Sequence, residues 1–166
     1  PNQVWATDLT YIKLPTGHMY LMAIIDLYSR KVLNWILTNT LDAPTFAICL
    51  RDTIEMWGAP AIFNTDQGCQ FTSECWTSVL HEYGVKISMD GKNRALDNIN
   101  IERLWRSLKY EDIYLRHYET VRELREGIDR YFNFYNTRRF HQGLDYLTPD
   151  EVYQSFQAVS QENKAA

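Results

Sequence analysis

The chain has 166 residues, 45% hydrophobic and 23% charged, with 23 aromatic side chains (5 Trp, 11 Tyr and 7 Phe), which fits one globular domain and excludes disordered and fibrous proteins. The longest apolar run, Tyr20–Ile25, is too short to cross a membrane, and the 3 cysteines and 4 histidines form no disulfide or zinc pattern, so we expect a soluble protein of a reducing cytosol. The net charge of −4 weighs against a nucleic-acid partner, but residues 86–139 hold 12 Lys+Arg against 9 Asp+Glu, so a basic pole and an acidic pole are expected.

The first half of the chain is predicted to contain three strands, then a helix, a strand, a second helix and a last strand. The strands of an antiparallel meander are expected at Val4–Lys13, Met19–Tyr28 and Val32–Thr40, because β-branched and aromatic residues alternate between short turns. The helices are expected at residues 43–57, capped by Asp42, and at about 72–83, and the remaining strands at 60–65 and 85–89.

The second half is predicted to be helical after a polar, mobile loop at Asp90–Ala95. Ile101, Leu104, Trp105 and Leu108 recur with helical spacing, and a similar apolar pattern continues through residues 120–135. A capping box at residues 148–151 begins a short final helix, and the polar tail after about residue 157 is expected to fray.

Three carboxylates stand out by position. Asp8 lies inside a predicted strand, where Asp is depleted; Asp66 follows a buried strand, where α/β folds place ligand groups; and Glu102 lies on an amphipathic helix. If these three side chains converge, their mutual repulsion calls for a cation, and carboxylate oxygens favour Mg²⁺ or Mn²⁺. Two such ions can activate a nucleophile and stabilise the leaving oxygen of a phosphodiester.

Ordinary structural roles compete with this interpretation. Asp66 in an Asp-Gln-Gly segment fits a turn, and Glu102 fits a solvated residue that pairs with Arg106. The interval between Asp66 and Glu102 also separates Asp90 from Glu126, so the spacing alone decides nothing. Glu126 has helical partners of its own in Arg122 and Arg130, four residues before and after it.

The helix that carries Glu102 also carries cations near the same face. At 100° per residue, Arg106 lies about 40° and Lys109 about 20° from Glu102, away from the apolar stripe. This face suits metal ligation beside phosphate contacts, and it equally suits a surface of alternating charges.

The chain resembles the integrase-like catalytic core of bacterial insertion-sequence transposases of the insertion-sequence-three group, which are relatives of retroviral integrases. The resemblance covers about 150 residues, in the family's order. The matching segments are WATDLTYI (5–12), AIIDLYSRKVL (23–33), FNTDQGCQFTS (63–73), SMDGK (88–92), LDNINIERLWRSLKYE (96–111), YFNFYNTRRFH (131–141) and TPDEVY (148–153).

This resemblance implies an α/β, ribonuclease-H-like fold, with a mixed five-stranded sheet and helices on both faces, over residues 1–157. The polar residues 158–166 are expected to be a disordered tail. The resemblance also implies that the family's N-terminal DNA-binding region is absent from this fragment, in keeping with a start at Pro1. The Asp-Asp-Glu triad maps to Asp8, Asp66 and Glu102, which would hold two Mg²⁺ or Mn²⁺ ions. DNA contacts map to Lys109, Arg103, Arg106, Arg138, Arg139 and His141.

The implied function is a DDE polynucleotidyl transferase that cleaves transposon ends and joins them to target DNA, as a homo-oligomer on DNA in the bacterial nucleoid. Two alternatives remain open: a plain nuclease of ribonuclease-H type and a catalytically silent DNA-binding or assembly module. Asn136 and His141 also fit a helix cap and a packed histidine. Asn100 and Cys69 depart from the family's pattern, in which an apolar or aromatic residue and a serine are more common.

Overall fold

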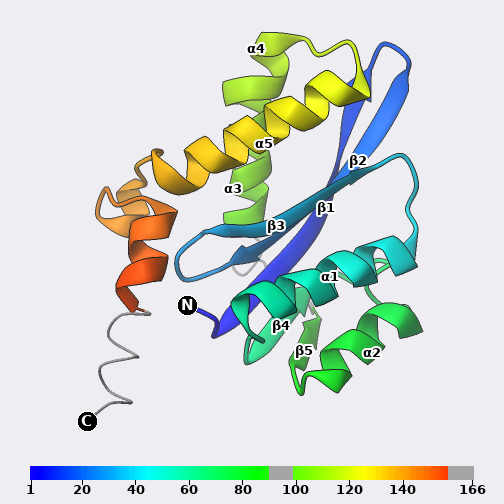
Figure 1. Cartoon of the computed structure of the whole chain (residues 1–166), viewed down its shortest axis with the longest axis vertical. Coiled ribbons are helices and arrows are strands. Elements are labelled where there is room, and N and C mark those ends of the chain that lie inside the picture. Colours follow the sequence, from blue (N-terminus) through cyan, green and yellow to red (C-terminus); the bar gives the residue numbers. More distant parts are fainter. Residues whose placement is uncertain (90–98, 157–166) are drawn as a thin grey trace.

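The computed structural model describes residues 1–89 and 99–156, which form one sheet covered by helices on both faces (Figure 1). The strands are β1 (Val4–Leu14), β2 (Gly17–Asp26), β3 (Val32–Thr38), β4 (Ile62–Thr65) and β5 (Lys86–Met89). The helices are α1 (Ala43–Trp57), α2 (Glu74–Glu82), α3 (Ile99–Leu108), the π-helix η1 (Lys109–Ile113), α4 (Tyr114–Arg116), α5 (Val121–Thr137) and the 3₁₀ helix η2 (Gln142–Leu144), and residues 149–156 are also helical.

The sheet is mixed, with the strand order β3-β2-β1-β4-β5. The first three strands form the predicted antiparallel meander, because their connections are too short for anything but hairpins. The strands β4 and β5 are parallel to β1, since each is reached through a helical crossover. The predicted mixed five-stranded sheet with helices on both faces is confirmed.

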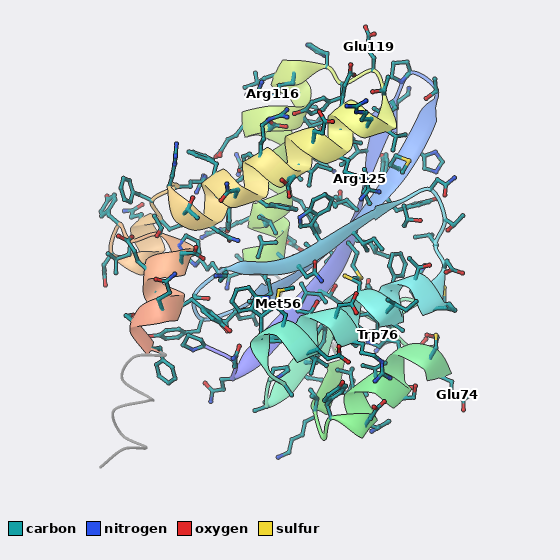
Figure 2. The ribbon with its side chains drawn as sticks, viewed as in Figure 1. Met56, Glu74, Trp76, Arg116, Glu119 and Arg125 are labelled. Atoms are coloured by element: carbon teal, nitrogen blue, oxygen red, sulfur yellow. The ribbon has the colours of Figure 1, made fainter. Side chains whose placement is uncertain are left out.

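Each face of the sheet has its own hydrophobic core. On one face, α1 and α2 pack against Trp5, Phe63 and the rest of one buried cluster, which includes the fully buried Trp76 labelled in Figure 2. On the other face, α3 and α5 pack against Ala6, Ile12 and the rest of a second cluster. Because side chains alternate along a strand, the even-numbered residues of β1 between Ala6 and Ile12 face α3 and α5.

Several predicted boundaries are shifted by one or two residues. The helix α2 begins at Glu74 rather than near residue 72, because the Ser73 hydroxyl caps it by accepting from the Trp76 backbone N–H. The strand β3 ends at Thr38 rather than Thr40. The helix after Glu102 is longer than its apolar spacing predicted, since η1 and α4 extend it until His117 adopts a left-handed conformation (φ 48°). The predicted loop at 90–95 and tail at 158–166 lie outside the described residues.

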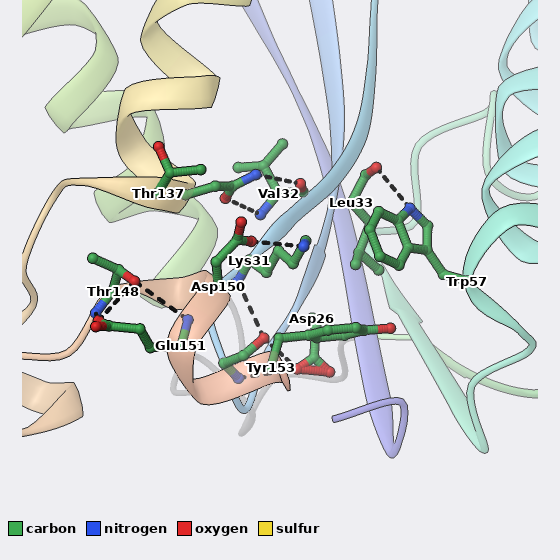
Figure 3. Close-up of polar contacts among 12 residues, drawn as sticks. Asp26, Lys31, Val32, Leu33, Trp57, Thr137, Thr148, Asp150, Glu151 and Tyr153 are labelled. Carbon is green, nitrogen blue, oxygen red and sulfur yellow. Dashed lines mark hydrogen bonds and ion pairs between the residues drawn. The ribbon is translucent and has the colours of Figure 1, made fainter. Parts of the chain in front are cut away.

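The C-terminal helix is fixed to the turn between β2 and β3 by a largely buried ion pair (Figure 3). The Lys31 ammonium lies 2.6 Å from the Asp150 carboxylate and 4.3 Å from the centre of the Trp57 ring. Nearby, the Asn136 side chain accepts from the Val32 N–H and donates to the Val32 carbonyl, which joins the end of α5 to β3. Asn136 therefore bonds a strand rather than capping its own helix. Within the described ranges, no helix is long and apolar enough to span a membrane.

Candidate active site

Asp8 lies in the middle of β1 on the face covered by α3. Asp8 is separated by an even number of residues along β1 from Ala6 and Ile12, so its side chain lies on the same face of the sheet. Ala6 and Ile12 belong to the core beneath α3 and α5. Its carboxylate accepts a hydrogen bond of 3.0 Å from the Trp105 indole N–H. A half-buried carboxylate within a strand is thus held in place by the neighbouring helix.

Asp66 occupies the matching position beside Asp8. The parallel register pairs Ala6 with Asn64, so two further residues along each strand lead to Asp8 and Asp66. Phe63 belongs to the core beneath α1 and α2, which places Asn64 on the α3 face. Asp66 follows the last residue of β4, and one of its oxygens accepts from the Gly68 N–H at 2.9 Å, so it also serves the turn that was the alternative interpretation.

Glu102 lies in the first turn of α3 and its side chain is exposed. The expected alternative, an ion pair with Arg106, is not formed within residues 1–89 and 99–156. By contrast, Glu126 pairs with Arg122 at 3.0 Å, as its helical spacing predicted. Asp90, the other member of the competing interval, lies outside the described residues.

Asp66 and Glu102 both act electrostatically on Asp8. Burial raises the pKa of Asp8 above its ordinary value, and the negative charges of Asp66 and Glu102 raise it further, while hydrogen bonds from Leu9 and Trp105 act in the opposite direction. In the part of the chain that the structure describes, no three His, Cys, Asp or Glu side chains are grouped closely enough to hold a metal ion. The convergence of Asp8, Asp66 and Glu102 therefore stays a prediction.

Four of the six residues mapped to DNA border one cavity. Arg103, Arg106, Arg139 and His141 border one cavity of about 760 Å³ between α3 and the segment after α5. Arg139 is held there by Glu111 at 2.6 Å, and this ion pair is the main reason why the pKa of Glu111 is lowered.

Two of the mapped cations lie away from this cavity. Lys109 borders a different cavity, of about 640 Å³, where its ammonium lies 5.6 Å from the centre of the Tyr11 ring. Arg138 is exposed at the end of α5, next to Arg139, and does not border the larger cavity. The structure thus separates Lys109 from the arginines with which it was grouped.

His141 is packed rather than solvated. Its ring lies 4.8 Å from that of Tyr135, and only 7% of the residue is exposed. Burial, together with the positive charges of Arg139 and Arg30, lowers the pKa of His141 to about 4, so the ring is neutral near pH 7. It can offer a hydrogen bond to a ligand but not a charge.

Two residues of this region were not recognised from the sequence. Trp105 was assigned only to the apolar face of its helix, although its indole N–H serves Asp8. The signal was available, since a buried Trp needs a partner for its N–H and Asp8 was the unusual polar residue of the facing strand. Arg30, which borders the larger cavity from the turn between β2 and β3, gave no such signal because only the fold brings it near α3.

Comparison with known proteins agrees with the geometry. Two family models, both described as integrase core domain, match residues 1–95 and 83–149. The transposase for insertion sequence element IS904 of Lactococcus lactis is 36% identical over 154 residues, which are 91% of this chain and 61% of that protein. Transposase InsF for insertion sequence IS3A of Escherichia coli is 31% identical over 154 residues, which are 91% of this chain and 54% of that protein. The chain thus spans little more than half the length of these relatives.

Solved structures share the fold at low sequence identity. The catalytic core domain of BIV integrase gives a TM-score of 0.77 at 18% identity, covering 97% of this chain and 99% of that one. The HTLV-2 integrase catalytic core domain, solved in complex with magnesium, gives 0.74 at 19% identity, covering 92% and 96%. The expected ribonuclease-H-like fold is therefore confirmed, and the chain belongs to the integrase core domain family.

Proposed function

We propose that this chain is the catalytic core of a DNA transposase, a DDE polynucleotidyl transferase that cleaves phosphodiesters at transposon ends and joins the ends to target DNA. The observation that carries this proposal is the parallel pairing of β1 with β4, in which Asp8 lies two residues after Ala6 and Asp66 two residues after its partner Asn64. The Trp105 indole N–H, from the helix that bears Glu102, donates to Asp8. The transposase relatives support the same chemistry.

The donor set suits a hard divalent cation. Asp8, Asp66 and Glu102 supply only carboxylate oxygens. Burial raises the pKa of Asp8, and the negative charges of Asp66 and Glu102 raise it further; a cation would relieve this repulsion. We propose that these three residues hold Mg²⁺ or Mn²⁺, in the two-ion arrangement expected from the resemblance. When bound, the ions would activate the attacking hydroxyl and neutralise the leaving 3′-oxygen.

The surrounding residues position these carboxylates. The Trp105 N–H donates to one oxygen of Asp8, and the Gly68 N–H donates to one oxygen of Asp66, so both carboxylates are held in place by neighbouring donors. Exposed Arg103 and Arg106 follow Glu102 on α3, where guanidinium groups can hold the DNA backbone beside the reacting phosphate.

We further propose that the protein acts as a homo-oligomer on DNA in the bacterial nucleoid.

A strand-transfer assay tests this function. Single-turnover reactions contain the chain, Mn²⁺ and a labelled transposon end that already carries a free 3′-hydroxyl, together with a target duplex. Joined products are expected, since the same in-line attack serves cleavage and joining. Hydrolysis without joining would instead support a ribonuclease-H-like nuclease. The absence of both reactions, with DNA binding retained, would support a silent binding module.

Lys109 is expected to contact the DNA backbone through its ammonium. It lies two helical turns beyond Glu102, and no carboxylate pairs with it in the described residues. In Lys109→Ala, DNA binding should weaken and the slope of log affinity against log salt should fall in magnitude by about one, because one phosphate contact is lost. Fluorescence anisotropy across a salt series measures this slope. A strong change in Mn²⁺ affinity with an unchanged slope would assign Lys109 to Glu102 instead.

A further inference from the structure

The cavity of about 760 Å³ is lined by arginines whose positive charges are mostly not paired with carboxylates. Arg30, Arg103, Arg106 and Arg139 all border it, and of these only Arg139 forms an ion pair with a carboxylate in the described part of the chain. Three unpaired guanidinium groups facing one space of about 760 Å³ favour an anionic ligand.

Arg30 reaches this cavity because of the local backbone. It adopts a left-handed conformation (φ 63°) in the turn after β2, and its guanidinium donates to the Gly143 carbonyl at 3.4 Å. A Cβ on Gly143 would lie 2.4 Å from an Arg30 nitrogen, so a larger residue there would require the guanidinium to shift. The turn and the segment after α5 are thus fitted together around this cation.

A buried polar atom lies at the same cavity. The Nε2 atom of His141 is inaccessible to solvent and has no hydrogen-bond partner among the residues described. A buried imidazole nitrogen without a partner carries a cost that a ligand hydrogen bond can offset. Asn100, Ser107 and Gln142 also border the cavity and add donors and acceptors.

Two aromatic side chains stand at the border of the cavity. Tyr110 and Phe140 are each 66% exposed, so both rings are accessible to a ligand in the cavity. Exposed aromatic rings beside arginines form stacking surfaces for unpaired nucleobases, because every base presents an apolar face to the ring and a phosphate to the cation.

We propose that this cavity binds one unpaired nucleotide of the DNA substrate, with the phosphate held by Arg30 and the arginines of α3 and the base stacked on Tyr110 or Phe140. This inference rests on the proposed function. The volume is that of a small-ligand site and admits one nucleotide rather than a duplex. His141, with its buried unpartnered nitrogen, offers one hydrogen bond within the cavity.

The position of the cavity gives the bound nucleotide a role. Asn100, Arg103 and Arg106 lie on the same helix as Glu102 and within about one turn of it. A nucleotide held here would open the DNA next to the phosphodiester that is cut, and would keep the two strands apart during joining. The base pair at the reacting end is the one expected to separate.

Competition between two duplexes tests the cavity. One is fully paired, and the other is identical except for three mismatched, unpaired terminal nucleotides at the transposon end. The wild-type protein should bind the frayed duplex more tightly. Arg30→Gln and Phe140→Leu should each reduce this preference by about 10-fold while affinity for the paired duplex stays nearly constant, and Phe140→Tyr should retain the preference.

The matched controls are Arg122→Gln and Phe134→Leu, which change an exposed arginine and an exposed phenylalanine of α5 that do not border the cavity. Both should keep the wild-type preference, and thermal melting confirms that every variant is folded. The proposal is overturned if the wild-type protein shows no preference, or if Arg30→Gln and Phe140→Leu weaken both duplexes equally. Loss of joining with the preference intact would overturn the proposed function alone, and joining without the preference would overturn the nucleotide site alone.

Discussion

Replacing Asp66 by Asn is expected to reduce Mn²⁺-dependent cleavage and joining by about 100-fold or more, because a neutral amide is a poor ligand for a hard divalent cation. The fold should be retained. An amide oxygen can still accept the Gly68 N–H, and removal of one negative charge relieves the repulsion that raises the pKa of Asp8. Free energies of unfolding from urea titrations should therefore equal or exceed that of the wild-type protein without metal.

Two measurements make this prediction specific. Adding Mn²⁺ should raise the melting temperature of the wild-type protein and raise that of Asp66→Asn much less, because an ion that binds only the folded state stabilises it. Glu126→Gln is the control, since Glu126 is exposed and paired with Arg122 near the start of α5. Unfolding of Asp66→Asn would mean that Asp66 serves mainly the turn. A severe catalytic loss in Glu126→Gln would mean that the wrong acid was chosen.

The strands and the sheet were predictable because local and global preferences agree. Residues of β1 to β3 alternate or run apolar between tight turns, and short turns permit only antiparallel pairing. Asp8 could be singled out as a candidate site residue from the same pattern, because Asp is depleted in β-strands and the residues around it strongly favour a strand. The partner of Asp8 did not follow, because Trp105 lies 97 residues away along the chain.

The register of the parallel strands is what spacing alone could not provide. The interval between Asp66 and Glu102 recurs between Asp90 and Glu126, whereas the pairing of Ala6 with Asn64 brings the strand that contains Asp8 beside the strand that Asp66 follows. Similarly, the basic composition of residues 86–139 could not reveal that the arginines of α3 share a cavity with Arg30. Contacts of this kind depend on the angle at which α3 crosses the sheet. The apolar residues of α3 show which side of the helix is buried, but they do not determine that angle.

The ion pair between Lys31 and Asp150 is expected to contribute strongly to stability. Only 8% of the Lys31 side chain and 21% of the Asp150 side chain are exposed. In Lys31→Met, the aliphatic contact with Trp57 and Tyr153 is largely kept, but a mostly buried carboxylate loses its partner. The free energy of unfolding should fall by about 2–3 kcal/mol, measured by urea unfolding, somewhat less than for a completely buried pair. Proteolysis should then cut the C-terminal helix first.

A second ion pair provides the comparison for this prediction. Arg51 and Glu82 lie 2.7 Å apart, close to the 2.6 Å of Lys31 and Asp150, but their side chains are 38% and 55% exposed. Arg51→Met should therefore have a small effect that disappears at high salt, whereas the effect of Lys31→Met should persist, because buried charges are poorly screened.

The double variant Lys31→Met/Asp150→Leu separates charge from packing. It should recover much of the lost stability, because replacing both partners by apolar side chains leaves no unpaired charge. If Lys31→Met costs no more than Arg51→Met, the ion pair does not fix the C-terminal helix. If the double variant is as unstable as Lys31→Met, the loss arises from packing around Trp57. Because Arg30 precedes Lys31 in the same turn, weakening this attachment should also reduce the preference for frayed DNA that the cavity is proposed to confer.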